Sequence, residues 1–124
     1  MYLIDTNILI YHFNKNIPEK SRPKLNDIFL NNFNISVISK MEFLGFKEHT
    51  RESFVKSKQF LEHANIININ DRIVESVIKL KRKYSIKLPD AIIAATALTS
   101  GLTIVTRNEQ DFKNVKCKIF NPFK

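Results

Sequence analysis

The sequence predicts an α/β domain with a mostly parallel central sheet. Short apolar segments with strand character alternate along the chain with longer segments of helical periodicity. Because parallel strands need a crossover connection, which a helix usually supplies, this alternation favours a parallel sheet covered by helices. The chain of 124 residues has no linker, repeat or low-complexity segment, so we expect one domain over residues 1–124.

The predicted strands are short apolar runs, most of them followed by a helix. They are expected at residues 2–4, 35–38, 66–69, 103–106 and 118–120. The first strand ends at Asp5, directly before a helix that runs from Ile8 to about Phe13. Thr6 or Asn7 is the expected cap of this helix, because short polar side chains satisfy the first free N–H groups.

The other helices are predicted from apolar spacing and from residues that favour helix ends. One starts at Ser39, and the rest are expected near residues 25–33, 54–62, 71–84 and 90–100. Residues 71–84 form the clearest amphipathic helix, since apolar side chains recur on one face only. Pro89 opens the helix that follows, and Gly101 closes it.

The composition is that of a globular chain with an excess of positive charge. With 44% hydrophobic and 26% charged residues it differs from a disordered tail, and no apolar run is long enough to span a bilayer. We expect no signal peptide, and the single cysteine, Cys117, fits a reducing cytoplasm and a buried strand position. The net charge of +8 favours nucleic acid as a partner, although a lysine-rich proteome gives the same excess.

Four of the 12 acidic residues stand out because they are flanked by apolar residues or lie at strand-to-helix junctions. They are Asp5, Glu42, Asp90 and Asp111. Each also has an explanation as a helix-end residue. Asp5 could cap the first helix, and Asp90 lies in a first turn, where the helix dipole favours a negative charge. Residues 39–42 match a capping box, and residues 108–111 resemble the capped opening of a short helix.

The predicted fold nevertheless gathers these acids at one place. Asp5, Glu42 and Asp111 each follow a predicted strand, and the carboxyl ends of parallel strands lie along one edge of a sheet, where α/β domains bind ligands. Asp90 joins them if its helix begins at the same edge. Clustered carboxylates repel one another unless a cation compensates, and Mg²⁺ or Mn²⁺ meets this need. A metal site on a basic chain is the combination that phosphodiester hydrolysis requires.

Other catalytic patterns are weak or absent. The three histidines are scattered, and we interpret them as surface or packing residues. With only two glycines the chain has no phosphate-binding loop, which argues against a dinucleotide-binding domain or a P-loop enzyme, and no nucleophile elbow is present. A phosphatase of the haloacid dehalogenase type needs a second Asp two residues after the first, where this chain has Asn7.

Four segments resemble the sequence blocks of the PIN-domain family, and most closely those of the VapC ribonuclease toxins of bacterial toxin–antitoxin pairs. They are residues 2–10 (YLIDTNILI), 36–45 (SVISKMEFLG), 88–97 (LPDAIIAATA) and 103–112 (TIVTRNEQDF). The blocks occur in the family's order and span nearly the whole chain.

The resemblance implies a PIN-like α/β/α sandwich with a mostly parallel central sheet, formed by residues 1–124 as a single PIN domain. It assigns Asp5, Glu42 and Asp90 as catalytic and metal-site carboxylates, and Asp111 matches a fourth, more variable acid. The polar positions that orient the acids or a bound water match Thr6, Thr106 and Asn108. Some relatives carry an Asp where this chain has Asn108, so a second metal ion would have fewer ligands here.

The resemblance further implies an Mg²⁺- or Mn²⁺-dependent endoribonuclease that acts in the cytoplasm without a membrane. In this interpretation Asp111 positions or deprotonates the attacking water, and Arg107, Lys40 and Lys87 steer RNA. The implied partners are an RNA substrate, a cognate antitoxin and a second copy of the chain, in a homodimer or a toxin–antitoxin hetero-oligomer. The alternative is a catalytically inactive PIN-like module that binds RNA or protein, which Mg²⁺-independent RNA binding without turnover would favour.

Overall fold

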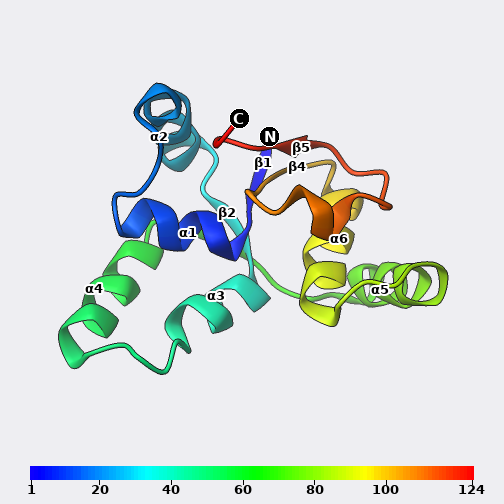
Figure 1. Ribbon diagram of the computed structural model, residues 1–124. Helices are drawn as coiled ribbons and strands as arrows, with labels where there is room; N and C mark the ends of the chain where they lie inside the picture. Colours follow the sequence, from blue (N-terminus) through cyan, green and yellow to red (C-terminus); the bar gives the residue numbers. More distant parts are fainter.

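Five short strands, all paired in parallel, form the centre of the molecule (Figure 1). The computed structural model describes residues 1–124. The strands are β1 (Tyr2–Ile4), β2 (Asn34–Ser36), β3 (Asn65–Ile67), β4 (Thr103–Val105) and β5 (Ile119–Phe120). β4 lies between β1 and β5, and β2 pairs with β3. β2 lies beside β1, where the Asn34 side chain donates to the Tyr2 carbonyl at 2.9 Å. The predicted parallel α/β fold is confirmed.

Six α-helices cover the strands on both sides. They are α1 (Thr6–Phe13), α2 (Arg22–Asn31), α3 (Val37–Leu44), α4 (Arg51–Leu61), α5 (Asp71–Lys83) and α6 (Leu88–Ser100). Two short 3₁₀ helices complete the fold, η1 (Glu19–Ser21) and η2 (Glu109–Phe112). None of these helices is both long and apolar enough to cross a membrane.

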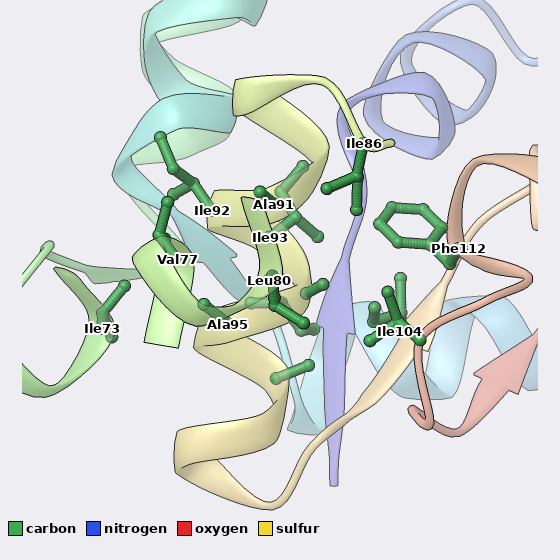
Figure 2. Close-up of a cluster of buried hydrophobic side chains, with 14 residues drawn as sticks. Ile73, Val77, Leu80, Ile86, Ala91, Ile92, Ile93, Ala95, Ile104 and Phe112 are labelled. Carbon is green, nitrogen blue, oxygen red and sulfur yellow. The ribbon is translucent and has the colours of Figure 1, made fainter. Parts of the chain in front are cut away.

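The side chains of the strands alternate between two hydrophobic cores, because successive residues of a strand point to opposite faces. Leu3 and Ile104 pack with α5 and α6, whereas Ile4 and Val105 pack with α1, α2 and α4. Figure 1 shows the same division, with α5 and α6 on one side of the strands. Figure 2 shows Ile104 and Phe112 of the first core facing the side chains of α6. The inner strands β1 and β4 are therefore covered on both faces.

The predicted start of the third α-helix is wrong. α3 begins at Val37, and the cap is Ser36, whose hydroxyl accepts a hydrogen bond from the Ile38 N–H at 3.2 Å. β2 ends at the same residue, where Ser36 pairs with Ile67. The strand is therefore shorter than predicted, and residues 39–42 do not form a capping box.

Two further helix ends also differ from a prediction. Of the alternatives for the cap of α1, Asp5 is confirmed and Thr6 or Asn7 is wrong, because the Asp5 carboxylate accepts from the Thr6 N–H at 2.8 Å. Asn108 precedes a 3₁₀ helix to which its side chain contributes no capping bond.

Cys117 lies half-buried in the irregular segment before β5, rather than at a buried position in a strand. By contrast, α5 and α6 agree with the sequence to within a residue or two, and Gly101 ends α6 with a positive φ of 66°.

Candidate active site

Asp5 lies at the centre of a polar cluster at the carboxyl ends of the strands. It follows β1 directly, and only 5% of it is exposed. Its carboxylate accepts three hydrogen bonds: Oδ1 from the Thr6 N–H at 2.8 Å, and Oδ2 from the Thr106 hydroxyl at 2.8 Å and the Asn7 amide at 3.0 Å. Burial raises the pKa of Asp5, and the hydrogen bonds from Thr106 and Thr6 oppose this rise.

Glu42 is joined to Asp5 through the residue that follows it. The Thr6 hydroxyl donates to Glu42 Oε1 at 2.7 Å. The fully buried Ser39 places its Oγ 2.9 Å from the same hydroxyl oxygen. Ser39 and Glu42 lie on successive turns of one helix face, since they are three residues apart in α3. The first turns of α1 and α3 therefore fix Glu42 beside the end of β1.

Asp90 and Asp111 complete a group of four carboxylates from four segments of the chain. Asp90 lies half-buried in the first turn of α6, and Asp111 lies exposed in η2. Burial raises the pKa of Asp90 to about 6, helped by the negative charges of the other three acids and opposed by Lys87. The charges of Glu42 and Asp111 likewise raise the pKa of Asp5. The structure thus brings all four predicted acids within electrostatic reach of one another.

Of the predicted supporting residues, Thr6 and Thr106 contact the acids through their side chains. Asn108 contributes only its backbone N–H, which donates to the Thr106 hydroxyl at 3.0 Å. The sequence interpretation missed Asn7, which bonds to Asp5 and also accepts from the Arg107 N–H at 3.2 Å. The sequence did offer a signal for Asn7, because it lies two residues after Asp5 in the first turn of the helix that Asp5 caps.

The three predicted RNA-steering residues differ in what they contact. The guanidinium of Arg107 donates to the Tyr11 hydroxyl at 2.9 Å and lies 4.4 Å from the centre of the Phe123 ring. This side chain therefore ties the C-terminal segment to α1. Lys87 precedes α6 near Asp90, and Lys40 lies exposed on α3; neither forms an ion pair.

The four carboxylates suit a hard divalent cation held in an open site. Carboxylate oxygens are the ligands that Mg²⁺ and Mn²⁺ prefer, and Mg²⁺ is often held by one or two carboxylates together with water and substrate phosphate. No three acidic, His or Cys side chains are close enough to hold an ion by themselves. Burial and the negative charges of the other three acids raise the pKa of Asp90, and a bound cation would compensate this cost of ionisation.

We expect Thr106→Val to lower the free energy of unfolding at pH 7.5 by about 1 kcal/mol, because Asp5 loses a buried donor. Thr106→Ser is the matched control, since it keeps the hydroxyl. Urea denaturation measures both variants. Equal stability of the two variants would contradict the role given to the hydroxyl.

Comparison with known proteins identifies the family and the fold of the chain. The family model of the PIN domain matches residues 2–117. A toxin–antitoxin complex from Klebsiella pneumoniae contains a chain of similar structure, with 34% identity, a TM-score of 0.81, and coverage of 100% of this chain and 99% of that chain. No curated protein sequence matches significantly.

Two further solved structures are similar over nearly the full length. VapBC2 from Rickettsia felis, bound to a DNA fragment from its promoter, has 26% identity and a TM-score of 0.78, with 97% of each chain covered. VapBC-1 from nontypeable Haemophilus influenzae has 23% identity and a TM-score of 0.82, with coverage of 99% of this chain and 98% of that chain. At 23% identity, the similarity to VapBC-1 shows a shared fold only.

Proposed function

Because the chain belongs to the PIN-domain family, we propose that it is a metal-dependent endoribonuclease and the toxin of a toxin–antitoxin pair. One observation supports this most strongly: four carboxylates from distant segments meet at the carboxyl edge of the sheet, around the buried Asp5. A domain that only binds RNA or protein gains nothing from such repulsion. A hydrolase gains a site for a cation and for a reacting water.

In this proposal Asp5, Glu42 and Asp90 hold Mg²⁺ or Mn²⁺ together with water and substrate phosphate, because no three acids are close enough to hold the ion alone. When bound, the ion supplies positive charge that neutralises the phosphate and makes water more acidic. Asn7 and Thr106 hold the Asp5 carboxylate in one orientation through their hydrogen bonds. Thr6 does the same for Glu42. The protein therefore orients its ligands before the substrate arrives, which lowers the cost of reorganisation.

Asp111 positions the attacking water and accepts its proton. Its side chain is exposed in η2, where a water and the RNA backbone have access. The water oxygen forms a bond to phosphorus, the bond from phosphorus to a ribose oxygen breaks, and that oxygen takes a proton from solvent water. Asp111 then returns its proton to solvent. The net charge of +8 attracts RNA to the protein.

The toxin role rests on the likeness to solved toxin–antitoxin complexes. We propose a cognate antitoxin as the inhibitor, a homodimer as the state of the free chain, and the cytoplasm as its place of action. The free thiol of Cys117 suits that reducing compartment.

The test is cleavage of single-stranded RNA by the purified chain, assayed with Mg²⁺, with Mn²⁺, and with EDTA. We expect cleavage with either metal, a loss of about 100-fold or more in EDTA, and recovery when Mn²⁺ is added back. A matched single-stranded DNA is the control substrate. Cleavage at an unchanged rate in EDTA would contradict the metal-dependent function, and turnover of DNA alone would contradict the RNA assignment.

A further inference from the structure

A hollow of about 170 Å³ opens directly beside two of the four acids. Asp90 and Asp111 form part of its wall. The rest is built by the loop between α5 and α6 and by the residues that follow η2, so it lies on one side of the proposed reaction centre. A substrate strand that reaches the acids would pass over it.

The hollow is part of the folded core rather than a gap between mobile loops. Ile86 and Val115 line it and belong to the same buried cluster as Phe112. Figure 2 shows the Ile86 side chain directed toward the Phe112 ring. The Lys81 ammonium donates to the Ile86 carbonyl at 2.6 Å and ties the loop back to α5. The floor of the hollow is therefore preformed.

The polar side chains around the hollow have no partners within the protein. The amides of Gln110 and Asn114 line it, and neither side chain takes part in any hydrogen bond. Lys87 and Lys113 also line it, and the two ion pairs of the chain involve neither. These four side chains are exposed, so in the free protein they are open to solvent and available to a ligand in the hollow.

An aromatic side chain completes the wall. Tyr84 lines the hollow, and its half-buried ring also packs against the core beneath. The Lys83 ammonium lies 5.4 Å from the centre of this ring and adds positive charge. Proteins that bind single-stranded nucleic acid combine these elements: an aromatic ring for stacking, amides for the base edge and lysines for phosphate.

We propose that this hollow binds one unpaired nucleotide of the RNA, next to the phosphodiester that is cleaved. Tyr84 stacks on the base, Gln110 and Asn114 form hydrogen bonds with its edge, and Lys87 and Lys113 contact the flanking phosphates. The inference rests on the proposed ribonuclease function and adds a site of sequence preference to it. A base within a duplex is stacked and paired, so the hollow selects single-stranded RNA.

The first experiment measures binding without cleavage. The fluorescence anisotropy of a labelled single-stranded decaribonucleotide is followed in EDTA at several salt concentrations. We expect Lys87→Ala combined with Lys113→Ala to weaken binding about tenfold at 0.1 M salt. The slope of log affinity against log salt falls by about 1.4, because two contacts to a single strand are lost. The control pair, Lys20→Ala with Lys56→Ala, removes the same charge from η1 and α4, and we expect a change of less than about threefold.

The second experiment separates stacking and base reading from charge. Tyr84→Ala is expected to weaken binding about tenfold, and Tyr84→Phe to restore it, because the ring alone stacks. Gln110→Ala with Asn114→Ala should change the base preferred at one position beside the cut when a random RNA library is digested with Mn²⁺. These two side chains are exposed, so the double variant keeps the fold.

The two proposals can fail separately. If the lysine pair weakens binding no more than its control pair, and Tyr84→Ala binds like Tyr84→Phe, the nucleotide site is refuted while the nuclease stands. Wild-type protein that binds no RNA also refutes it. An unchanged base preference in the Gln110 and Asn114 double variant refutes base reading. If RNA binding changes in these variants as expected but the wild-type chain cleaves no RNA, the nucleotide site is supported and the ribonuclease function is overturned.

Discussion

Asp5→Asn is expected to abolish RNA cleavage, with a loss of about 100-fold or more in the initial rate with Mn²⁺. The substitution keeps the size and planarity of the side chain but removes its negative charge. Asp5 is the most buried of the four acids and accepts three hydrogen bonds, so no neighbouring carboxylate can take its position. Asp90→Asn should have a comparable effect, because Asp90 faces the same group of charges.

Asp71→Asn is the matched control for these variants. Asp71 begins α5 and lies beside Leu98 and Thr99, at the end of α6 opposite Asp90. We expect its cleavage rate to stay within about twofold of wild type, since only an exposed charge at a helix end changes. Circular dichroism and urea denaturation verify that all three variants fold. Full activity in both Asp5→Asn and Asp90→Asn would disprove the carboxylate assignment.

The same Asp90→Asn variant is expected to be more stable than wild type in metal-free buffer at pH 7.5. Folding raises the pKa of Asp90 from 3.8 to about 6, so the folded protein disfavours the ionised carboxylate. One pKa unit corresponds to about 1.4 kcal/mol. Because Asp90 is only half-buried, water screens part of this cost, and we expect a gain of about 1–2 kcal/mol in the free energy of unfolding.

The gain should depend on pH in a defined way. Below pH 4 Asp90 is protonated in both the folded and unfolded chain, so wild type and variant differ little there. Between about pH 4 and pH 6 the unfolded chain ionises first and wild type loses stability relative to the variant. Above pH 6 the difference is constant. Urea denaturation at pH 3.5, 5 and 7.5 in EDTA measures this profile.

Addition of Mg²⁺ should reverse the order of stability. In the proposed site the ion binds the folded wild type and stabilises it by mass action, whereas Asp90→Asn would lack one ligand and respond less. Asp71→Asn should respond to Mg²⁺ as wild type does. An Asp90→Asn variant that is no more stable than wild type at pH 7.5 would contradict the cost of ionising Asp90 in the folded protein. A variant whose free energy of unfolding rises as much with Mg²⁺ as that of wild type would contradict the role of Asp90 as a ligand.

The fold was predictable because its periodic signals are local. α5 shows its apolar face in the sequence, and Pro89 and Gly101 mark the ends of α6. The boundary between β2 and α3 was predicted wrongly because Ser36 and Ser39 are both good caps in sequence. Only the pairing of Ser36 with Ile67 decides between them, and that contact joins distant segments.

The acids of the site were predictable for a different reason. The positions of Asp5, Glu42 and Asp111 after strands predict that they lie at one edge once the strands are taken as parallel, even though the capping explanation failed for Glu42 and Asp111. Asp90 follows no strand and joins them because α6 begins near the same edge. The network around them was not predictable. Ser39 contacts Thr6 across 33 positions, and Asn7 contacts Thr106 across 99. Such contacts depend on packing between helices and strands that no single segment encodes.

The arrangement of β1 and β4 also has a consequence for synthesis of the protein. β1 is the first strand made, yet its backbone partner β4 is residues Thr103–Val105, and β4 lies between β1 and β5. Thr106, which holds Asp5, comes directly after β4. A nascent chain thus lacks the partner of β1 and a donor to Asp5 until most of it has been translated. The sheet around β1 and the hydrogen bond from Thr106 to Asp5 therefore form only after residues 103–106 have left the ribosome.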